Sequence, residues 1–310
     1  MRTPHLIAAT ILTLALTGCH FHSVTQQADL SFEPPIPQPA YSEGQGPVVQ
    51  LDEAHFNFHT VDGRYAPFAK LLRRDGFVVQ PLADPATADS LARGSIYVIA
   101  NAIAESDRKG WKLPAEQAFT KDEIEAIRNW VEEGGSLFLI ADHMPFPGSV
   151  QDLAAAFDIL FGNGFLYDAS ESSKLEFTRD TGLAEHPITE GRDASERIDS
   201  VRTFTGQAFR AGRDVDPLLT VPPGSTLRLR VKAWKFKPTT PAVPAAGMLQ
   251  GAVLRFGKGR VAVFGEAAMF SAQERIGKSE RELMGMNRPD AAQNAQFLLN
   301  VMHWLSGLLR

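Results

Sequence analysis

Residues 129–143 read NWVEEGGSLFLIADH and contain the end of an amphipathic helix followed by a buried strand, an alternation that recurs along the chain. The helix that ends in this stretch begins at residues 120–123 (TKDE), a capping box whose side chains satisfy the first backbone N–H groups of a helix. Two glycines, at 134 and 135, end the helix. The apolar run 136–141 then predicts a strand buried on both faces, and Asp142 and His143 follow it directly.

The same alternation of buried strand and amphipathic helix extends in both directions from this stretch. Further strands are predicted at residues 48–51, 77–79 and 95–102, and helices at 65–74, 150–161 and 291–309. Residues 226–236 and 250–264 are typical of β-hairpins, whereas residues 165–247 as a whole are irregular. We therefore predict one α/β domain over residues 48–310, with a mainly parallel sheet, helices on both faces, a β-hairpin near the C-terminus and an irregular insertion.

The N-terminus has the pattern of a bacterial lipoprotein signal peptide over residues 1–18. Arg2 precedes an apolar run, residues 6–16, that is too short to span a bilayer. Residues 16–19 (LTGC) resemble a lipobox, in which the cysteine is lipidated and becomes the new first residue. His20 stands where aspartate would favour the inner membrane. We expect a protein of the bacterial cell envelope, held in the outer membrane by a lipid on Cys19 and facing the periplasm.

Composition and charge exclude some kinds of catalysis and argue against some kinds of partner. Cys19 is the only cysteine, so a lipidated chain has no thiol left for catalysis, a disulfide or a metal site. The net charge is −5 and no block of lysine and arginine occurs, which argues against a nucleic-acid partner. Residues 19–47 are proline-rich and weakly apolar, which predicts an extended tether between the membrane and the domain.

Polar side chains collect where the predicted strands end. In an open α/β sheet, ligands bind beyond the carboxyl ends of the strands, so we expect these side chains to line one crevice. The residues that end or follow a strand are Asp52, Glu53, His55, Asn57, His59, Asn101, Asp142, His143 and Glu266. Each has a purely structural alternative, such as a wet strand edge at 54–59, a turn cap at Asp142 or a helix cap at Glu266.

Three roles are predicted for these residues and for His186, which lies in the irregular region. The catalytic candidates are Asp142, His143 and Glu266, because carboxyl and imidazole groups are suited to acid–base work. Substrate binding is assigned to Glu53, Asn57, Asn101 and His186. The candidate ligands of a divalent metal, Zn or Mn, are Asp52, His55 and His59, whose nitrogen and oxygen donors suit those ions. Acid–base chemistry without a metal is the open alternative.

Several stretches together resemble the class I glutamine amidotransferase-like superfamily. They are NWVEEGGSLFLIADH, HPITEG, GKGRVAVFGEAAMFS and NAQFLLNVMHWL, and the similarity covers most of residues 48–308. The closest resemblance is to its bacterial branch near ThuA-like proteins and to the GIFT domain of intraflagellar transport. This resemblance implies a flavodoxin-like sheet with a crevice at the same edge, and carbohydrate binding or scaffolding as the activity. Amidotransferases carry a cysteine nucleophile where this chain has Asp142 and His143, so it is not a glutamine amidotransferase.

These observations lead to one expected function and one alternative. We expect an exported lipoprotein whose degenerate amidotransferase-like domain binds a polar small molecule or glycan, and as a hydrolase would cleave it. The chain has no GxSxG elbow, P-loop or GxGxxG turn, which removes several commoner kinds of enzyme. The alternative is a scaffolding or binding module of the cell envelope without enzymatic activity.

Overall fold

The computed structural model describes residues 25–212, 214–277 and 281–310. The predicted signal peptide and Cys19 lie outside these residues. Within them, no helix has the length and apolar character needed to cross a membrane.

A nine-stranded sheet forms the centre of the fold, with strand order β3-β2-β4-β5-β15-β14-β10-β6 and β11 paired with β14. Its first five strands are parallel, and the remainder pair antiparallel. In this order, the strands are Val78–Leu82, Val48–Asp52, Ile96–Ala100, Ser136–Ile140, Gly259–Phe264, Leu249–Phe256, Phe209–Ala211 and Ile159–Phe161, with β11 at Asp216–Thr220. Strands β4 and β5 are buried along their whole length, as their continuous apolar character predicts.

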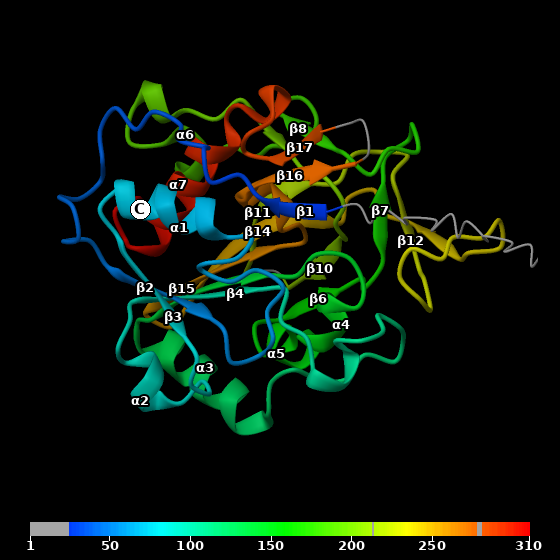
Figure 1. Cartoon of the computed structure of the whole chain (residues 1–310), viewed down its shortest axis with the longest axis horizontal. Coiled ribbons are helices and arrows are strands. Elements are labelled where there is room, and N and C mark those ends of the chain that lie inside the picture. The colour runs from blue at the N-terminus through cyan, green and yellow to red at the C-terminus, as the bar shows by residue number, and fades with distance from the viewer. Residues whose placement is uncertain (1–24, 213, 278–280) are drawn as a thin grey trace, which may run out of the picture.

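Helices cover both faces of this sheet, as Figure 1 shows. On one face, α1 (Ala66–Arg74), α7 (Asn294–Leu305) and the short α6 (Pro187–Glu190) share a hydrophobic core with it. On the other face lie α2 (Ala88–Leu91), α3 (Lys121–Glu133) and α5 (Gln151–Ala155), while α4 (Phe146–Ser149) lies just after β5. The α/β class, the mainly parallel sheet and the flavodoxin-like arrangement are thereby confirmed.

The irregular insertion is built from short strands in small separate sheets. The sheet β13-β12-β7 joins Ala242–Pro244, Thr226–Arg228 and Phe165–Tyr167, and a two-stranded sheet joins β8 (Glu176–Thr178) to β9 (Ser200–Arg202). The hairpin predicted at 226–236 begins where expected, at β12, but its second strand is β13, so residues 229–241 form the loop between them and β7 pairs with the other edge of β12. The hairpin predicted at 250–264 is confirmed by β14 and β15.

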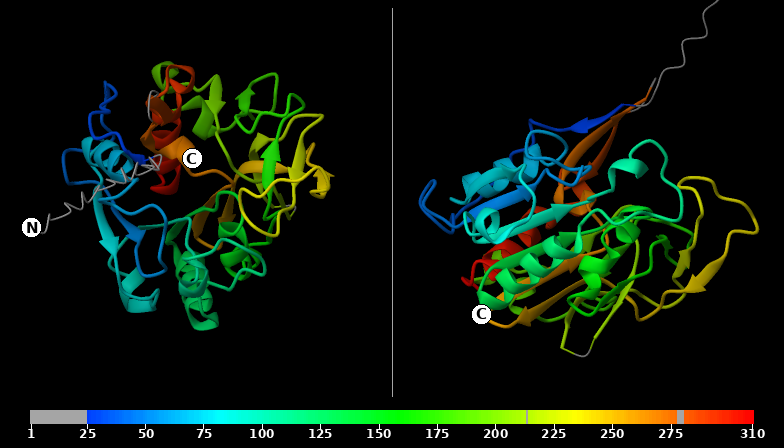
Figure 2. Two further views of the ribbon diagram at one scale, coloured as in Figure 1. Left: turned by 45° about the vertical axis from the view of Figure 1, so that its right-hand side comes forward. Right: turned by 90° about the horizontal axis from the view of Figure 1, so that it is seen from below.

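A third small sheet brings the N-terminal segment onto the domain. Strand β1 (Thr25–Ala28) pairs with β16 (Ala272–Ile276), which forms a hairpin with β17 (Arg281–Gly285), and Figure 2 shows them together in blue and orange. Further along, the Ala40 N–H donates to Asp75 and the Tyr41 hydroxyl donates to Ser306, each over 2.8–2.9 Å. The tether was predicted over residues 19–47; its described part, from residue 25 onward, instead packs on the domain, because its few apolar side chains find partners there.

Buried Asp75 joins three separate parts of the chain at the end of α1. Besides the Ala40 N–H, its carboxylate contacts the Nε2 of His303 in α7 over 2.6 Å, and both side chains are fully buried. The segment before the first strand of the main sheet is therefore fixed to the two helices of one layer.

Candidate functional site

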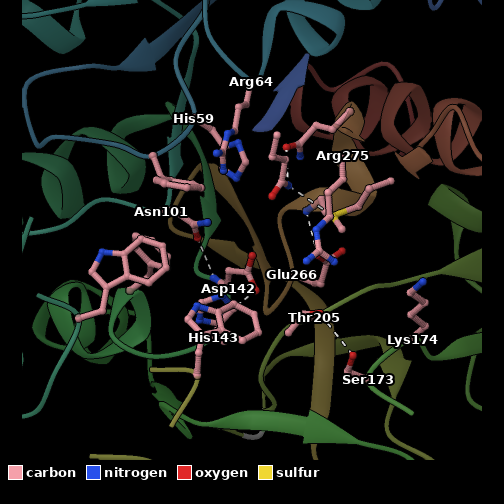
Figure 3. Close-up of a pocket in the computed structure, with 18 of the residues that line it drawn as sticks. His59, Arg64, Asn101, Asp142, His143, Ser173, Lys174, Thr205, Glu266 and Arg275 are labelled. Atoms are coloured by element: carbon pink, nitrogen blue, oxygen red, sulfur yellow. Dashed lines mark hydrogen bonds between the residues drawn. The ribbon is translucent and has the colours of Figure 1, made fainter. Parts of the chain in front are cut away.

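A cavity of about 510 Å³ lies beyond the carboxyl ends of β4, β5 and β15. It is lined by five of the residues predicted from the strand ends, which are His59, Asn101, Asp142, His143 and Glu266. Figure 3 shows these side chains around the opening. The edge of the sheet where parallel strands end is thus hollowed, as the general rule for open α/β sheets predicts.

The register of the sheet places two carboxyl groups side by side. Ile140 of β5 pairs with Phe264 of β15 in a parallel ladder, so Asp142 and Glu266 emerge two residues further on at the same height. Glu266 is fully buried, and its carboxylate accepts the N–H groups of Ala268 and Met269 over 2.8 and 2.7 Å. It therefore caps a short 3₁₀ helix and lines the cavity at once, while its catalytic role stays a prediction.

Burial controls the protonation of this pair. For Asp142, desolvation raises the pKa to about 7, against the lowering effect of the N–H that His143 donates over 2.7 Å. For Glu266, desolvation and the nearby charge of Asp142 raise the pKa to about 8. Two carboxyls this close cannot both ionise easily, so near neutral pH the pair shares protons, as in sites that pair an acid with a base.

His143 is held as a neutral base by its surroundings. Its Nδ1 lies 2.8 Å from the carbonyl oxygen of Met144, which accepts the Nδ1 proton and leaves Nε2 without one. Burial lowers the pKa of His143 to about 4, so the ring stays neutral at physiological pH. The ring stacks on Phe165 at 4.5 Å and meets the edge of Trp234 at 4.7 Å. A fixed neutral imidazole of this kind can accept a proton or a hydrogen bond from a ligand.

Aromatic side chains form one wall of the cavity. Phe58, Trp111 and Phe146 pack with ring centroids 5.0–5.7 Å apart, and Trp234 joins them from the loop after β12. Trp234 is 54% exposed and Phe58 37%, so both present ring surface to solvent. Exposed aromatic rings of this size commonly mark binding surfaces.

The opposite wall is polar and comes from the small sheet β1-β16-β17. Gln26, Gln273, Arg275 and Glu282 line the cavity here, together with Lys174 from the insertion. Glu282 accepts from Lys174 over 2.7 Å and lies 3.7 Å from Arg275. Sequence reasoning missed this wall, although the alternation of residues in 272–276 is a strand signal that could have been followed.

Asp52, His55 and His59 do not form the predicted metal site. The Asp52 carboxylate accepts from the Nδ1 of His55 over 2.8 Å, from the hydroxyl of Tyr97 over 2.8 Å, and from the amide of Asn57. The Nε2 of His55 lies 2.9 Å from Glu123 of α3, so both ring nitrogens already have protein partners. Among the described residues, no three His, Cys, Asp or Glu side chains are arranged to hold a metal ion.

His55 and Asn57 belong to a buried structural network, and His59 lies apart from it. Burial lowers the pKa of His55, but hydrogen bonds and charge from Asp52 and Glu123 outweigh it and raise the pKa overall. His55, Asn57 and His59 are buried while Phe56 and Phe58 are exposed, as predicted, but residues 54–59 form turns and bends, with Phe56 at φ 47°, rather than an extended segment. This network fixes the loop from which His59 reaches the cavity.

Two further substrate-binding candidates also lie outside the cavity lining. Glu53 accepts the N–H of Val61 over 2.8 Å and so closes the loop after β2. His186 caps α6 by accepting the Ile188 N–H at Nδ1 over 3.1 Å, and its ring packs against Trp304. Both side chains stabilise local structure, which is the alternative that a sequence pattern alone could not exclude.

No family model matches the chain, and no curated protein matches it. Among solved structures, the mmIFT52 N-terminal domain is 14% identical with a TM-score of 0.58, over 84% of this chain and 97% of that domain. The cytoplasmic protein STM3548 from Salmonella typhimurium is also 14% identical, with a TM-score of 0.50 over 84% of this chain and 98% of that one. A protein described as ThuA-like from Bacteroides uniformis has 13% identity and a TM-score of 0.47, covering 87% and 95% of the two chains. Identities this low show a shared fold and leave activity open.

Replacing Asp142 by asparagine should stabilise the protein at high pH. The folded-state pKa of Asp142 lies above its ordinary value of 3.8, so burial of the neutral form favours folding below that value, and the benefit is lost as the pH rises through about 7. Asparagine stays neutral throughout. We expect the melting temperature of Asp142→Asn to exceed that of the wild type by roughly 3 °C or more at pH 9, and to differ little at pH 4.

The control for this measurement is Asp152→Asn, which changes an exposed aspartate of α5 and should leave the melting temperature at both pH values unchanged. A melting temperature of Asp142→Asn at or below the wild-type value at pH 9 would mean that the folded protein stabilises the ionised carboxyl.

Proposed function

We propose that the cavity binds a polar, sugar-like small molecule or glycan fragment. The observation that carries this proposal is the pairing of an exposed aromatic wall with buried polar groups in one cavity. A sugar ring has apolar C–H faces and a rim of hydroxyls, so it can stack on aromatic rings while its hydroxyls exchange hydrogen bonds with polar side chains.

Neutral polar side chains in the wall agree with the same ligand class. Asn101 adopts a left-handed backbone conformation with φ 62°, and its Oδ1 accepts the N–H of Asp142 over 2.8 Å. Asn101, His59 and His143 line the cavity together with the carboxyl pair. Amide and imidazole groups exchange hydrogen bonds with hydroxyls, so this lining suits a ligand with several hydroxyl or amide groups.

Hydrolysis of the bound ligand is a second candidate, favoured by the Asp142–Glu266 pair. The protonated carboxyl can donate its proton to the leaving oxygen as the glycosidic C–O bond breaks. The other group, ionised, or the Nε2 of His143, can take a proton from the water whose oxygen forms the new C–O bond. The raised pKa values of the two carboxyls keep an acid available near neutral pH.

The place of action we propose is the bacterial cell envelope, with a lipid on Cys19 holding the domain at the outer membrane. The support is the N-terminal sequence, residues 1–19, and in particular the single cysteine that ends its LTGC stretch. In this setting the ligands within reach are glycans of the envelope.

Trp234→Ala should weaken sugar binding without unfolding the protein. Half of the Trp234 side chain is solvent-exposed, so its loss costs little stability, whereas it removes one of the exposed rings on which a sugar would stack. We expect titration calorimetry with N,N′-diacetylchitobiose to show affinity reduced roughly tenfold, about 1.4 kcal/mol. Phe236→Ala, in the same loop but outside the cavity lining, is the matched control. Unchanged affinity in Trp234→Ala, or no binding of any sugar by the wild type, would contradict the proposal.

Asp142→Asn should abolish hydrolysis while sparing binding. A carboxyl that transfers a proton in the reaction contributes on the order of 10²–10⁴-fold to the rate, so release of new reducing ends from chito-oligosaccharides should fall by at least that lower factor. Glu53→Gln is the control, because this carboxylate leaves the same edge of the sheet but lies outside the cavity lining. Binding without any release of reducing ends by the wild type would leave a binding module as the function.

Cys19→Ser should release the protein from the membrane. Serine cannot carry the thioether-linked lipid, so fractionation of expressing bacteria should move the protein from the membrane pellet to the soluble fraction. Continued sedimentation with membranes would show that Cys19 does not anchor the chain.

A further inference from the structure

We propose that the cavity prefers sugars that carry a carboxylate, and that Arg64 is the residue that holds this acidic group. This inference rests on the proposed function, since it names the class of sugar that the same cavity would take. The inference depends on Arg64, whose guanidinium has no carboxylate partner among the described residues.

Arg64 lies in the cavity wall without a charged partner. Its side chain is partly buried, and its guanidinium carbon is 4.0 Å from the centroid of the Phe58 ring. Over residues 25–212, 214–277 and 281–310, it forms no ion pair with any carboxylate and no hydrogen bond. The other two cations of the cavity, Lys174 and Arg275, both lie next to Glu282. Arg64 is thus the cavity cation whose donors are left for a ligand.

A partly buried guanidinium without a partner is unfavourable, which points to a ligand that completes it. Burial lowers the pKa of Arg64, the direction expected when the charged form loses water without gaining a partner. Guanidinium groups bind carboxylates through two parallel hydrogen bonds, a geometry that lysine cannot reproduce. Stacking on Phe58 holds the plane of the guanidinium and leaves its N–H edges free.

The groups around Arg64 are suited to a ligand that is both acidic and rich in polar groups. His59, 97% buried, lines the cavity beside Arg64, and burial followed by the charge of Arg64 lowers its pKa to about 3. It is therefore neutral and offers a hydrogen bond rather than a second charge. Asn101 lines the same cavity and adds a neutral amide group.

The carboxyl pair does not oppose this assignment. Asp142 and Glu266 would repel an anion if both were ionised, but near neutral pH their buried pair retains protons. In Figure 3, Arg64 and His59 lie on one side of the cavity and Asp142 and His143 on the other. A ligand spanning the cavity would then place its acidic group at Arg64 and a neutral ring near the carboxyl pair.

Two matched pairs of sugars test this selectivity. Glucuronic acid differs from glucose, and N-acetylmuramic acid from N-acetylglucosamine, by groups that include one carboxylate. We expect titration calorimetry on the full chain to show that wild type binds the acidic member of each pair at least roughly tenfold more tightly. Arg64→Gln should reduce this preference to near equality, and Arg64→Lys should retain part of it. Added salt should weaken binding of the acidic members only.

Arg108→Gln is the matched control, because its guanidinium also lies over an aromatic ring, Phe56 at 4.5 Å, outside this cavity. It should keep the wild-type preference. Thermal melts report folding separately, and Arg64→Gln should melt at or above the wild-type temperature, since it removes an unpaired buried charge.

The outcomes separate this inference from the proposed function. Equal binding of acidic and neutral members by wild type would overturn the inference and leave the sugar site in place. A preference that survives Arg64→Gln would also overturn it, by assigning the acid to another cation. Failure of every sugar to bind at millimolar concentrations would overturn both.

Discussion

The site depends on two carboxyl groups buried beyond adjacent parallel strands. Removing a carboxylate from water costs several kcal/mol, a large share of the total stability of an ordinary domain, so a fold keeps such a pair only where its surroundings fix the pair. Here the register of β5 against β15 sets the heights of Asp142 and Glu266, and backbone N–H groups from the turn and the 3₁₀ helix hold their oxygens. Asn101 and His143 are then positioned by short hydrogen bonds within the same group of strand ends.

The sequence predicts the sheet and this edge because both follow from local patterns. Continuous apolar strands, capped helices and glycine stops are readable residue by residue, and polar side chains directly after such strands must reach the same crevice. This reasoning located His59, Asn101, Asp142, His143 and Glu266 in the cavity. It could not separate them from Asp52 and His55, because the partners that close that network, Tyr97 and Glu123, lie 45 and 68 residues further along the chain.

The residues that sequence reasoning missed come from loops and from a strand pair outside the main sheet. Arg64, Trp111 and Trp234 belong to segments without periodicity, whose place depends on the packing of distant parts of the chain. Dependence on distant contacts also explains why the N-terminal segment was predicted to be a tether. A proline-rich stretch has the composition of a linker, yet β1 finds an open strand edge on β16, and hydrogen bonds to an unpaired edge stabilise a strand whatever its composition.

Two parts of the cavity lining differ in how firmly the fold holds them. Asp142, His143 and Glu266 directly follow β5 and β15 of the buried central sheet, whereas the polar wall is a thin sheet of three short strands, β1, β16 and β17, whose outer residues, such as Ile276 at 41% exposed, face water. Strands with so few buried contacts exchange their amide hydrogens through local opening at far lower free energy than core strands. Because Gln26 of β1 donates to Gln273 of β16 at the cavity wall, the first strand of the described residues takes part in that opening. We therefore expect this side of the cavity to open locally far more often than the strand ends that carry the carboxyl pair.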